Sequence, residues 1–258
     1  MRYLTITAGI LGLALMAWMP LTQPAAADQS TKPMSSALDE PTRGSTTALG
    51  MPLYNPPKRG APGGRVGGGT RGSGDDLPVV SVLAPDHVGL TVQEQPSLYW
   101  YLSKATTFPV ELVIIISQGI QPTAPLMEKR IPAPAQPGVH RIRLADFGVR
   151  LSTGAQYQWF VSLVRKPDRR SNDVIAGGFI ERVAPPEAVT VSLAQAGNAK
   201  APHVYAESGL WYDAVMALSE MIEAAPKDRG LRQQRAALMK QVRLPEIAEY
   251  DLKQPTAD

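Results

Sequence analysis

The chain of 258 residues contains no cysteine. Disulfide bridges, thiolate metal sites and cysteine nucleophiles are therefore excluded together. Since no covalent cross-link is available, the folded part of the chain must be stabilised by its apolar core alone.

Histidine, another residue of catalytic and metal sites, is scarce. The three histidines lie far apart and match no metal-ligand spacing. No Gly-x-Ser-x-Gly nucleophile elbow occurs either. Because no nucleophile, base or metal set is visible, we expect no catalytic residues, no metal site, no cofactor and no enzymatic activity.

An excess of charge is also missing. The formal net charge is only +3, and the basic residues are scattered rather than gathered in one run. A nucleic-acid-binding surface normally appears as a basic patch or stripe. We therefore expect no nucleic-acid partner.

The first 27 residues have the pattern of a secretory signal peptide. Arg2 supplies the positive charge, Ile6–Met19 is apolar, and Ala25–Ala27 gives the small residues of a cleavage site. An uncleaved membrane anchor is the alternative, but the apolar run is shorter than the roughly 20 residues that span a bilayer. We therefore expect an exported protein, periplasmic or extracellular, with no stable membrane span after cleavage.

Two low-complexity segments follow the signal. Residues 28–59 are polar and lack apolar periodicity, which predicts a disordered linker. Residues 60–76 form a Gly-rich lead-in segment that contains Arg65 and Arg71. Its Gly-x-Gly-x-x-Gly match lacks the preceding strand and following helix of a dinucleotide site. Two interpretations remain: an ordered turn with both arginines bonded to carboxylates or carbonyls, or a flexible linker.

Residues 77–184 change to a β pattern. About seven short apolar stretches are separated by turn signals roughly every 8–12 residues, which is typical of an antiparallel β-sandwich. We therefore predict a mainly β fold with an immunoglobulin- or fibronectin-like sandwich. Trp100 and Trp159 each lie within an apolar strand pattern, and we expect both to pack in its core.

Three tyrosines are the candidate exposed aromatics. Tyr99 and Tyr101 alternate with Trp100 and so belong to the opposite face of their strand. Together with Tyr157 they are the only side chains that could form a stacking surface for a sugar.

Residues 185–258 change to a helical period. Two helices, Pro202–Ala225 and Asp228–Arg243, are predicted to form a C-terminal α-helical hairpin. Trp211 lies at one end of the apolar stripe of the first helix, and we expect it to dock against the β domain. Asp213 is expected to form a salt bridge or hydrogen bond to the sandwich; Arg71 is one potential partner.

Several motifs together carry a family resemblance. They are, in chain order, Gly60–Pro62 with Arg65, Gly67–Gly72, Leu83–Pro85, Gly89–Thr91, Tyr157-x-Trp159, Gly177–Arg182 and Gly209–Ala214. With these motifs the chain resembles the exported bacterial family catalogued as domain of unknown function 928. The resemblance implies export without an assigned activity or known catalytic residues. Members of that family often have a cysteine after the Gly-Thr-Arg-Gly run, whereas this chain has Ser73 there.

Two functions fit these observations. The first is a non-catalytic envelope protein, an interaction or structural module that binds another envelope protein. The second is a carbohydrate-binding sandwich that would use the exposed tyrosines. The exposure of the three tyrosines distinguishes the two.

The signal pattern generates the first prediction. Because cleavage is expected after Ala27, mass spectrometry of the mature protein should find Asp28 at or within a few residues of its N-terminus. An envelope-localised protein that retains Met1 would contradict the cleaved signal.

Overall fold

The computed structural model describes residues 50–58, 64–67, 77–116, 125–131 and 136–254. All of them belong to one compact unit, Thr46–Asp258. The predicted signal peptide, most of the predicted linker and Arg71 lie outside the described residues.

The larger sheet has five strands in the order β2-β8-β7-β4-β5. Its strands are, in that order, Gly89–Thr91, Val174–Arg182, Gln156–Leu163, Val110–Ile116 and Met127–Ile131. All pairs are antiparallel except β2 with β8, which run parallel. The apolar run of β4 lies inside the sheet as its composition predicts, and the charged β5 lies at an edge, where charges discourage pairing with another chain.

The smaller sheet has three antiparallel strands in the order β1-β3-β6. They are Val80–Val82, Ser97–Leu102 and Gly138–Arg143. All six residues of β3 are buried, so this strand is covered on both faces. Trp100 belongs to the core shared with the five-stranded sheet, whereas Tyr101 packs on Tyr250 of a C-terminal helix at 5.3 Å between ring centroids.

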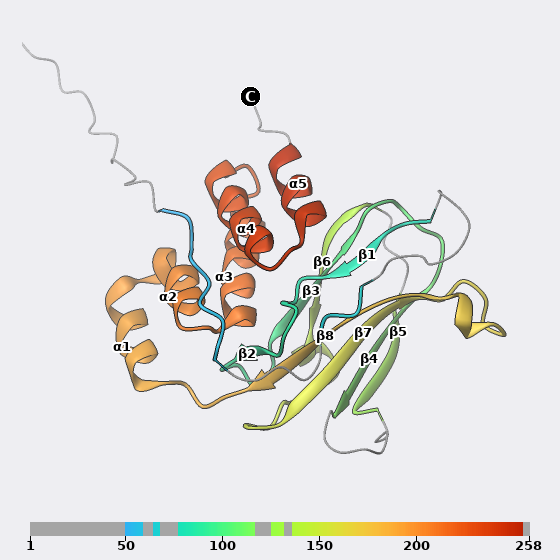
Figure 1. Ribbon diagram of the computed structural model, residues 1–258, viewed down its shortest axis with the longest axis horizontal. Coiled ribbons are helices and arrows are strands. Elements are labelled where there is room, and N and C mark those ends of the chain that lie inside the picture. The colour runs from blue at the N-terminus through green and yellow to red at the C-terminus, as the bar shows by residue number, and fades with distance from the viewer. Residues whose placement is uncertain (1–49, 59–63, 68–76, 117–124, 132–135, 255–258) are drawn as a thin grey trace, which may run out of the picture. The chain divides into compact units, whose positions relative to one another are not determined.

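Five α-helices follow the sheets (Figure 1). They are α1 Glu187–Ala196, α2 Ala201–Glu207, α3 Trp211–Ala224, α4 Arg229–Gln241 and α5 Pro245–Lys253. Asp228 caps α4, since its carboxylate accepts a hydrogen bond from the Leu231 N–H at 3.2 Å. Short 3₁₀ turns occur at Leu144–Phe147, Arg170–Asn172 and Asn198–Lys200.

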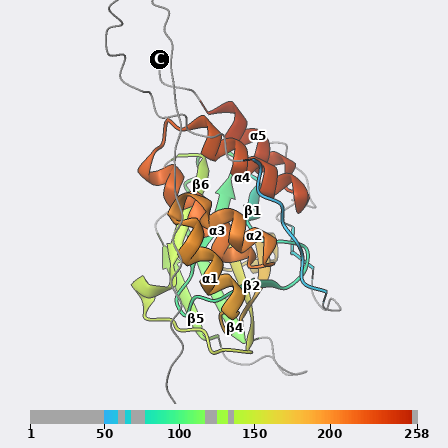
Figure 2. The same cartoon turned by 90° about the vertical axis from the view of Figure 1, so that its left-hand side faces the viewer.

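The helical region differs from the predicted two-helix hairpin. The predicted helix from Pro202 to Ala225 is divided into α2 and α3 by Gly209, whose φ of +76° cannot continue a right-handed helix. A further helix, α5, packs on α4. The fold therefore combines two sheets with helices that share their core, instead of a mainly β domain followed by a hairpin (Figures 1 and 2).

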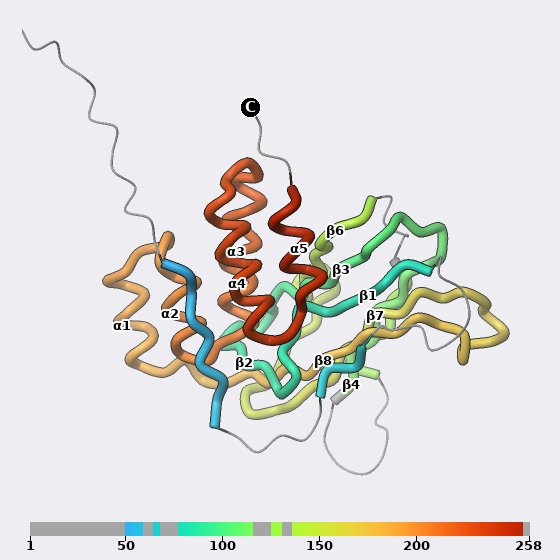
Figure 3. The backbone as a smooth tube through the Cα atoms, turned by 45° about the horizontal axis from the view of Figure 1, so that its top comes forward, coloured from blue at the N-terminus to red at the C-terminus, as the bar shows by residue number. Residues whose placement is uncertain are grey.

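Gly50–Lys58 corrects the prediction that the chain is disordered up to residue 59. The backbone is extended here, with Pro52 and Tyr54 buried. The Asn55 N–H donates to the Ala206 carbonyl in α2 at 3.1 Å, and Gln241 in α4 bonds both Pro52 and Tyr54 at 2.8–2.9 Å. Figure 3 shows this blue segment passing α2 and α4. Its prolines restrict the unfolded chain, so docking costs less entropy than polar composition suggests.

Among the described helices, none is long and apolar enough to cross a lipid bilayer.

Trp211 connects the helices to the sheets, as predicted. Its side chain is 0% exposed, and its indole N–H donates to the carbonyl of Leu83, just after β1, at 2.8 Å. Tyr54 packs edge-on against the indole at 4.9 Å. Helix, sheet and N-terminal segment therefore all contact one indole ring.

Trp211 provides a test of this packing. Trp211→Ala should lower the free energy of unfolding by about 3–5 kcal/mol, because a large cavity opens. Trp211→Phe should lose less, about 1–3 kcal/mol, since it mainly leaves the Leu83 carbonyl unpaired. Urea denaturation measures both.

Val191→Ala on α1 is the matched control, since Val191 is 48% exposed. It should change stability by no more than about 0.5 kcal/mol. If Trp211→Ala unfolds at the same urea concentration as the parent, Trp211 does not hold the helices to the sheets.

Candidate functional site

The first turn of α3 inserts three consecutive side chains into the interior: Trp211, Tyr212 and Asp213, each no more than 2% exposed. Each bonds a different part of the β structure, since Trp211 reaches the end of β1, Tyr212 reaches β7 and β8, and Asp213 reaches the end of β2. The motif Trp-Tyr-Asp therefore has a structural role.

Tyr212 links two strands of the five-stranded sheet. Its hydroxyl accepts from the indole N–H of Trp159 at 2.9 Å and donates to the Phe179 carbonyl at 2.9 Å. A Cβ on Gly89 would approach the Tyr212 ring to 2.6 Å, which is shorter than any normal contact. Glycine at position 89 is therefore needed for the tyrosine to enter.

Asp213 is a buried carboxyl that forms a hydrogen bond to the β structure, one of the two interactions expected for it. Its Oδ2 accepts from the Val92 N–H at 3.1 Å, and its Oδ1 has no partner among the described residues. Burial raises the pKa of Asp213 to about 7, and hydrogen bonds from Val92, Thr91 and Gln93 offset only part of this effect. A pairing with Arg71 lies outside the described residues.

Arg65 bonds carbonyl groups, and carbonyls are one of the two kinds of partner predicted for it. Its guanidinium donates to the carbonyls of Ala84, Val242 and Arg243 at 2.9–3.0 Å. The next residue, Val66, forms a β-bridge with Gly177 in β8. For residues 64–67 the ordered interpretation of the Gly-rich segment is therefore confirmed; Arg71 lies outside the described residues.

Both tryptophans of the predicted core are buried, Trp100 at 1% and Trp159 at 0% exposure. This confirms their expected role in packing.

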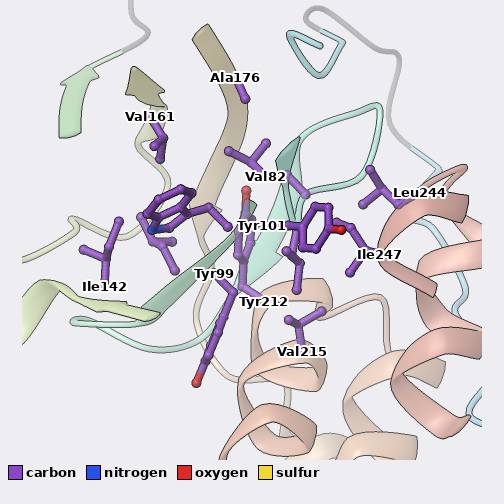
Figure 4. Close-up of a cluster of buried hydrophobic side chains, with 14 of the residues drawn as sticks. Val82, Tyr99, Tyr101, Ile142, Val161, Ala176, Tyr212, Val215, Leu244 and Ile247 are labelled. Carbon is purple, nitrogen blue, oxygen red and sulfur yellow. The ribbon is translucent and has the colours of Figure 1, made fainter. Parts of the chain in front are cut away.

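The three candidate exposed tyrosines are buried, so the prediction of an exposed sugar-stacking row is wrong. Tyr99, Tyr101 and Tyr157 are 3%, 7% and 3% exposed. The alternation along β3 is as predicted, but helices cover the face on which Tyr99 and Tyr101 lie. Figure 4 shows the Tyr101 ring directed toward Leu244 and Ile247 at the start of α5. The hydroxyl of Tyr157 instead accepts a local hydrogen bond from the Ser152 N–H at 2.9 Å.

The other face of the five-stranded sheet is apolar at its centre. Cross-strand register places five apolar side chains on it, from β4, β7 and β8, and none belongs to the core of the described residues. These residues define the outer sheet face: Val113, Ile115, Phe160, Ile175 and Phe179. Ile175 is 39% exposed, and the others are partly exposed.

Polar pairs surround the outer sheet face. At one end Glu111 accepts two hydrogen bonds from the Arg170 guanidinium, at 2.6 and 3.3 Å. At the other end Gln156 donates to Glu181 at 2.9 Å. An apolar centre within a polar rim is the usual anatomy of a protein interface.

The sequence analysis did not identify the outer sheet face, because consecutive apolar residues in β4 do not distinguish the two faces of the strand. The face becomes visible only when neighbouring strands are aligned, because Val113 lies opposite Phe160 and Gln158 lies opposite Phe179. Strand pairing cannot be read from one strand alone. Among the described residues, no group of three acidic or histidine side chains could hold a metal ion.

Asp213 generates a pH-dependent prediction. The pKa of Asp213 is about 7 in the folded protein and about 3.9 in the unfolded chain. The contribution of this carboxyl to the free energy of unfolding is therefore fully present below pH 4 and is lost as the pH rises toward 7. Asp213→Asn removes this titration while keeping the shape. Between pH 5 and 8 the parent should lose about 2–3 kcal/mol of stability relative to the variant, at about 1.4 kcal/mol per pKa unit.

Urea denaturation at a series of pH values measures this difference. Stability curves of parent and variant that run parallel between pH 5 and 8 would show that the carboxyl is already charged in the folded protein.

Comparison with known proteins matches the chain over residues 66–252 to the model of one family, Domain of Unknown Function (DUF928). Comparison with curated proteins gives no match. The matched residues include both sheets, α1 to α4 and nearly all of α5. The chain therefore belongs to the DUF928 family.

Proposed function

We propose that the protein is an exported, non-catalytic envelope protein that binds another protein through the outer sheet face. The observation that carries this proposal is the group of five apolar side chains, from Val113 in β4 to Phe179 in β8, at solvent-facing positions. Contiguous exposed apolar residues with a polar rim mark interaction sites in soluble proteins.

Export is supported by the signal-like composition of the first 27 residues. An interaction role is supported by the absence, from the sequence, of any recognisable catalytic motif. We further propose that the two sheets form an immunoglobulin- or fibronectin-like sandwich, a scaffold that often presents binding surfaces; the antiparallel pairing of β4, β7 and β8 supports this.

The proposal is tested with the paired variants Ile175→Glu and Ile115→Glu on the outer sheet face. Each places a charge within the outer sheet face, so each should abolish co-purification of the partner from envelope extract. Both side chains lie outside the core, so thermal stability should change little.

Val191→Glu makes the same chemical change on α1, which lies away from the outer sheet face. This control should retain the partner. A partner that Val191→Glu loses and Ile175→Glu keeps would place the interaction on the helices and contradict the proposal.

A further inference from the structure

One edge of the five-stranded sheet is the strand β5, Met127–Ile131. It pairs with β4 on one side, and no other described strand pairs with it on the far side. Figure 1 shows β5 beside β4 at the end of the sheet. An edge strand presents backbone N–H and C=O groups to which another extended strand can bond. The side chains of β5 therefore decide which strand it accepts.

The register with β4 divides the charges of β5 between the two sides of the sheet. Glu128 lies opposite Val113 and Arg130 lies opposite Glu111, so both belong to the side of the outer sheet face. Lys129, between them, belongs to the other side. All three charged residues of β5 are exposed. One side of this edge thus carries a negative and a positive charge two residues apart.

The two charges differ in what surrounds them. Arg130 lies 3.7 Å from Glu111 in β4, and Glu111 also accepts from the Arg170 guanidinium at 2.6 Å. Charges therefore alternate from Arg170 through Glu111 to Arg130, which is 58% exposed at the edge. Glu128 has no ion-pair partner among the described residues. A strand that places an acid opposite Arg130 and a base opposite Glu128 would continue this alternation.

A second copy of β5 meets both requirements. Two copies paired antiparallel about a two-fold axis at Lys129 place Glu128 of each copy opposite Arg130 of the other, because a two-fold contact is reciprocal. An axis between two residues would oppose side chains from different sides of the sheet. An axis at Glu128 or at Arg130 would oppose like charges on that side, which is destabilising. The register about Lys129 is the one that forms two pairs of opposite charge.

We propose that β5 pairs with β5 of a second copy of this chain, in this register, and so forms a symmetric dimer. The charges that discourage pairing with other strands become complementary in this one arrangement, which gives specificity. Lys129 faces its own copy across the axis, and this lowers the affinity. One pair of short strands buries less area than the roughly 1,200–2,000 Å² of stable complexes, so we expect a Kd on the order of 100 µM.

The dimer has a consequence for the outer sheet face, although the proposal does not depend on what that face binds. The two-fold axis is perpendicular to the extended sheet, so the outer sheet faces of both copies lie on the same side. A partner with two binding segments would then gain affinity by engaging both copies at once.

Lys129→Cys in the full mature protein tests the register directly. The parent has no cysteine, so the new thiol can form a disulfide only with a second copy. Opposite residues of an antiparallel pair have Cα atoms about 4.5–5.5 Å apart, within the range of a disulfide. Mild oxidation below the expected Kd should therefore give a covalent dimer, measured over time by non-reducing electrophoresis. Val191→Cys, at a 48% exposed position on α1, is the matched control and should cross-link at least about tenfold more slowly.

Charge reversals in the Lys129→Cys background test the pairing of the two charges. Glu128→Arg and Arg130→Glu should each slow cross-linking about tenfold, because each turns both opposite-charge pairs into like-charge pairs. A mixture of the two reversed proteins should cross-link at about the parental rate, because all pairs between unlike copies are again of opposite charge. Glu128→Arg changes an exposed side chain, so its result holds even if Arg130→Glu disturbs the contact with Glu111.

Three results would overturn the proposal. The first is cross-linking of Lys129→Cys no faster than that of Val191→Cys. The second is a rate that Glu128→Arg leaves unchanged, which would place any dimer contact away from β5. The third is a mixture of two folded, reversed proteins that cross-links as slowly as either protein alone.

Discussion

Burial of the first turn of α3 in the β structure is the interaction on which the rest of this fold depends. Trp211, Tyr212 and Asp213 are consecutive, yet each bonds a different strand end or strand backbone. A helix with only one buried stripe could slide or detach, since apolar contact is not directional. Hydrogen bonds from all three side chains, in different directions, fix its position. Glycine at position 89 gives the Tyr212 ring the space it needs.

This insertion explains why sheets and helices share one core. The three-stranded sheet is covered by the five-stranded sheet on one face and by α3 to α5 on the other, so β3 is buried throughout. Gly50–Lys58 and Arg65 add further links, to α2 and α4 and to the residues that follow α4. A chain without disulfides thus obtains its stability from the packing of the two sheets, the helices and the N-terminal segment on one another. Among the described residues, the same arrangement leaves the apolar side chains of the outer sheet face outside the core.

Local patterns in the sequence predicted much of this structure. The strand alternation around Trp100 and the burial of Trp159 and Trp211 follow from local apolar patterns, and the structure confirms them. The exposure of Tyr99 and Tyr101 was predicted wrongly because it depends on helices more than a hundred residues away.

Two other differences have equally specific causes. The break at Gly209 depends on a left-handed backbone conformation that a helical apolar pattern does not reveal. The docking of Gly50–Lys58 depends on Gln241 and Ala206, which no local pattern near residue 50 predicts. The outer sheet face combines side chains from separate strands, which is why a single sequence did not show it.

Hydrogen exchange as a function of urea, measured by mass spectrometry, tests most directly whether the inserted turn joins sheets and helices into one cooperative unit. Peptides from α3 to α5 and peptides from β7 and β8 report on the two parts separately. The account predicts that both sets become exchangeable in the same transition, with the same free energy of opening. Helical peptides that exchange at lower urea while β7 and β8 stay protected would show that the helices open independently, and would contradict it.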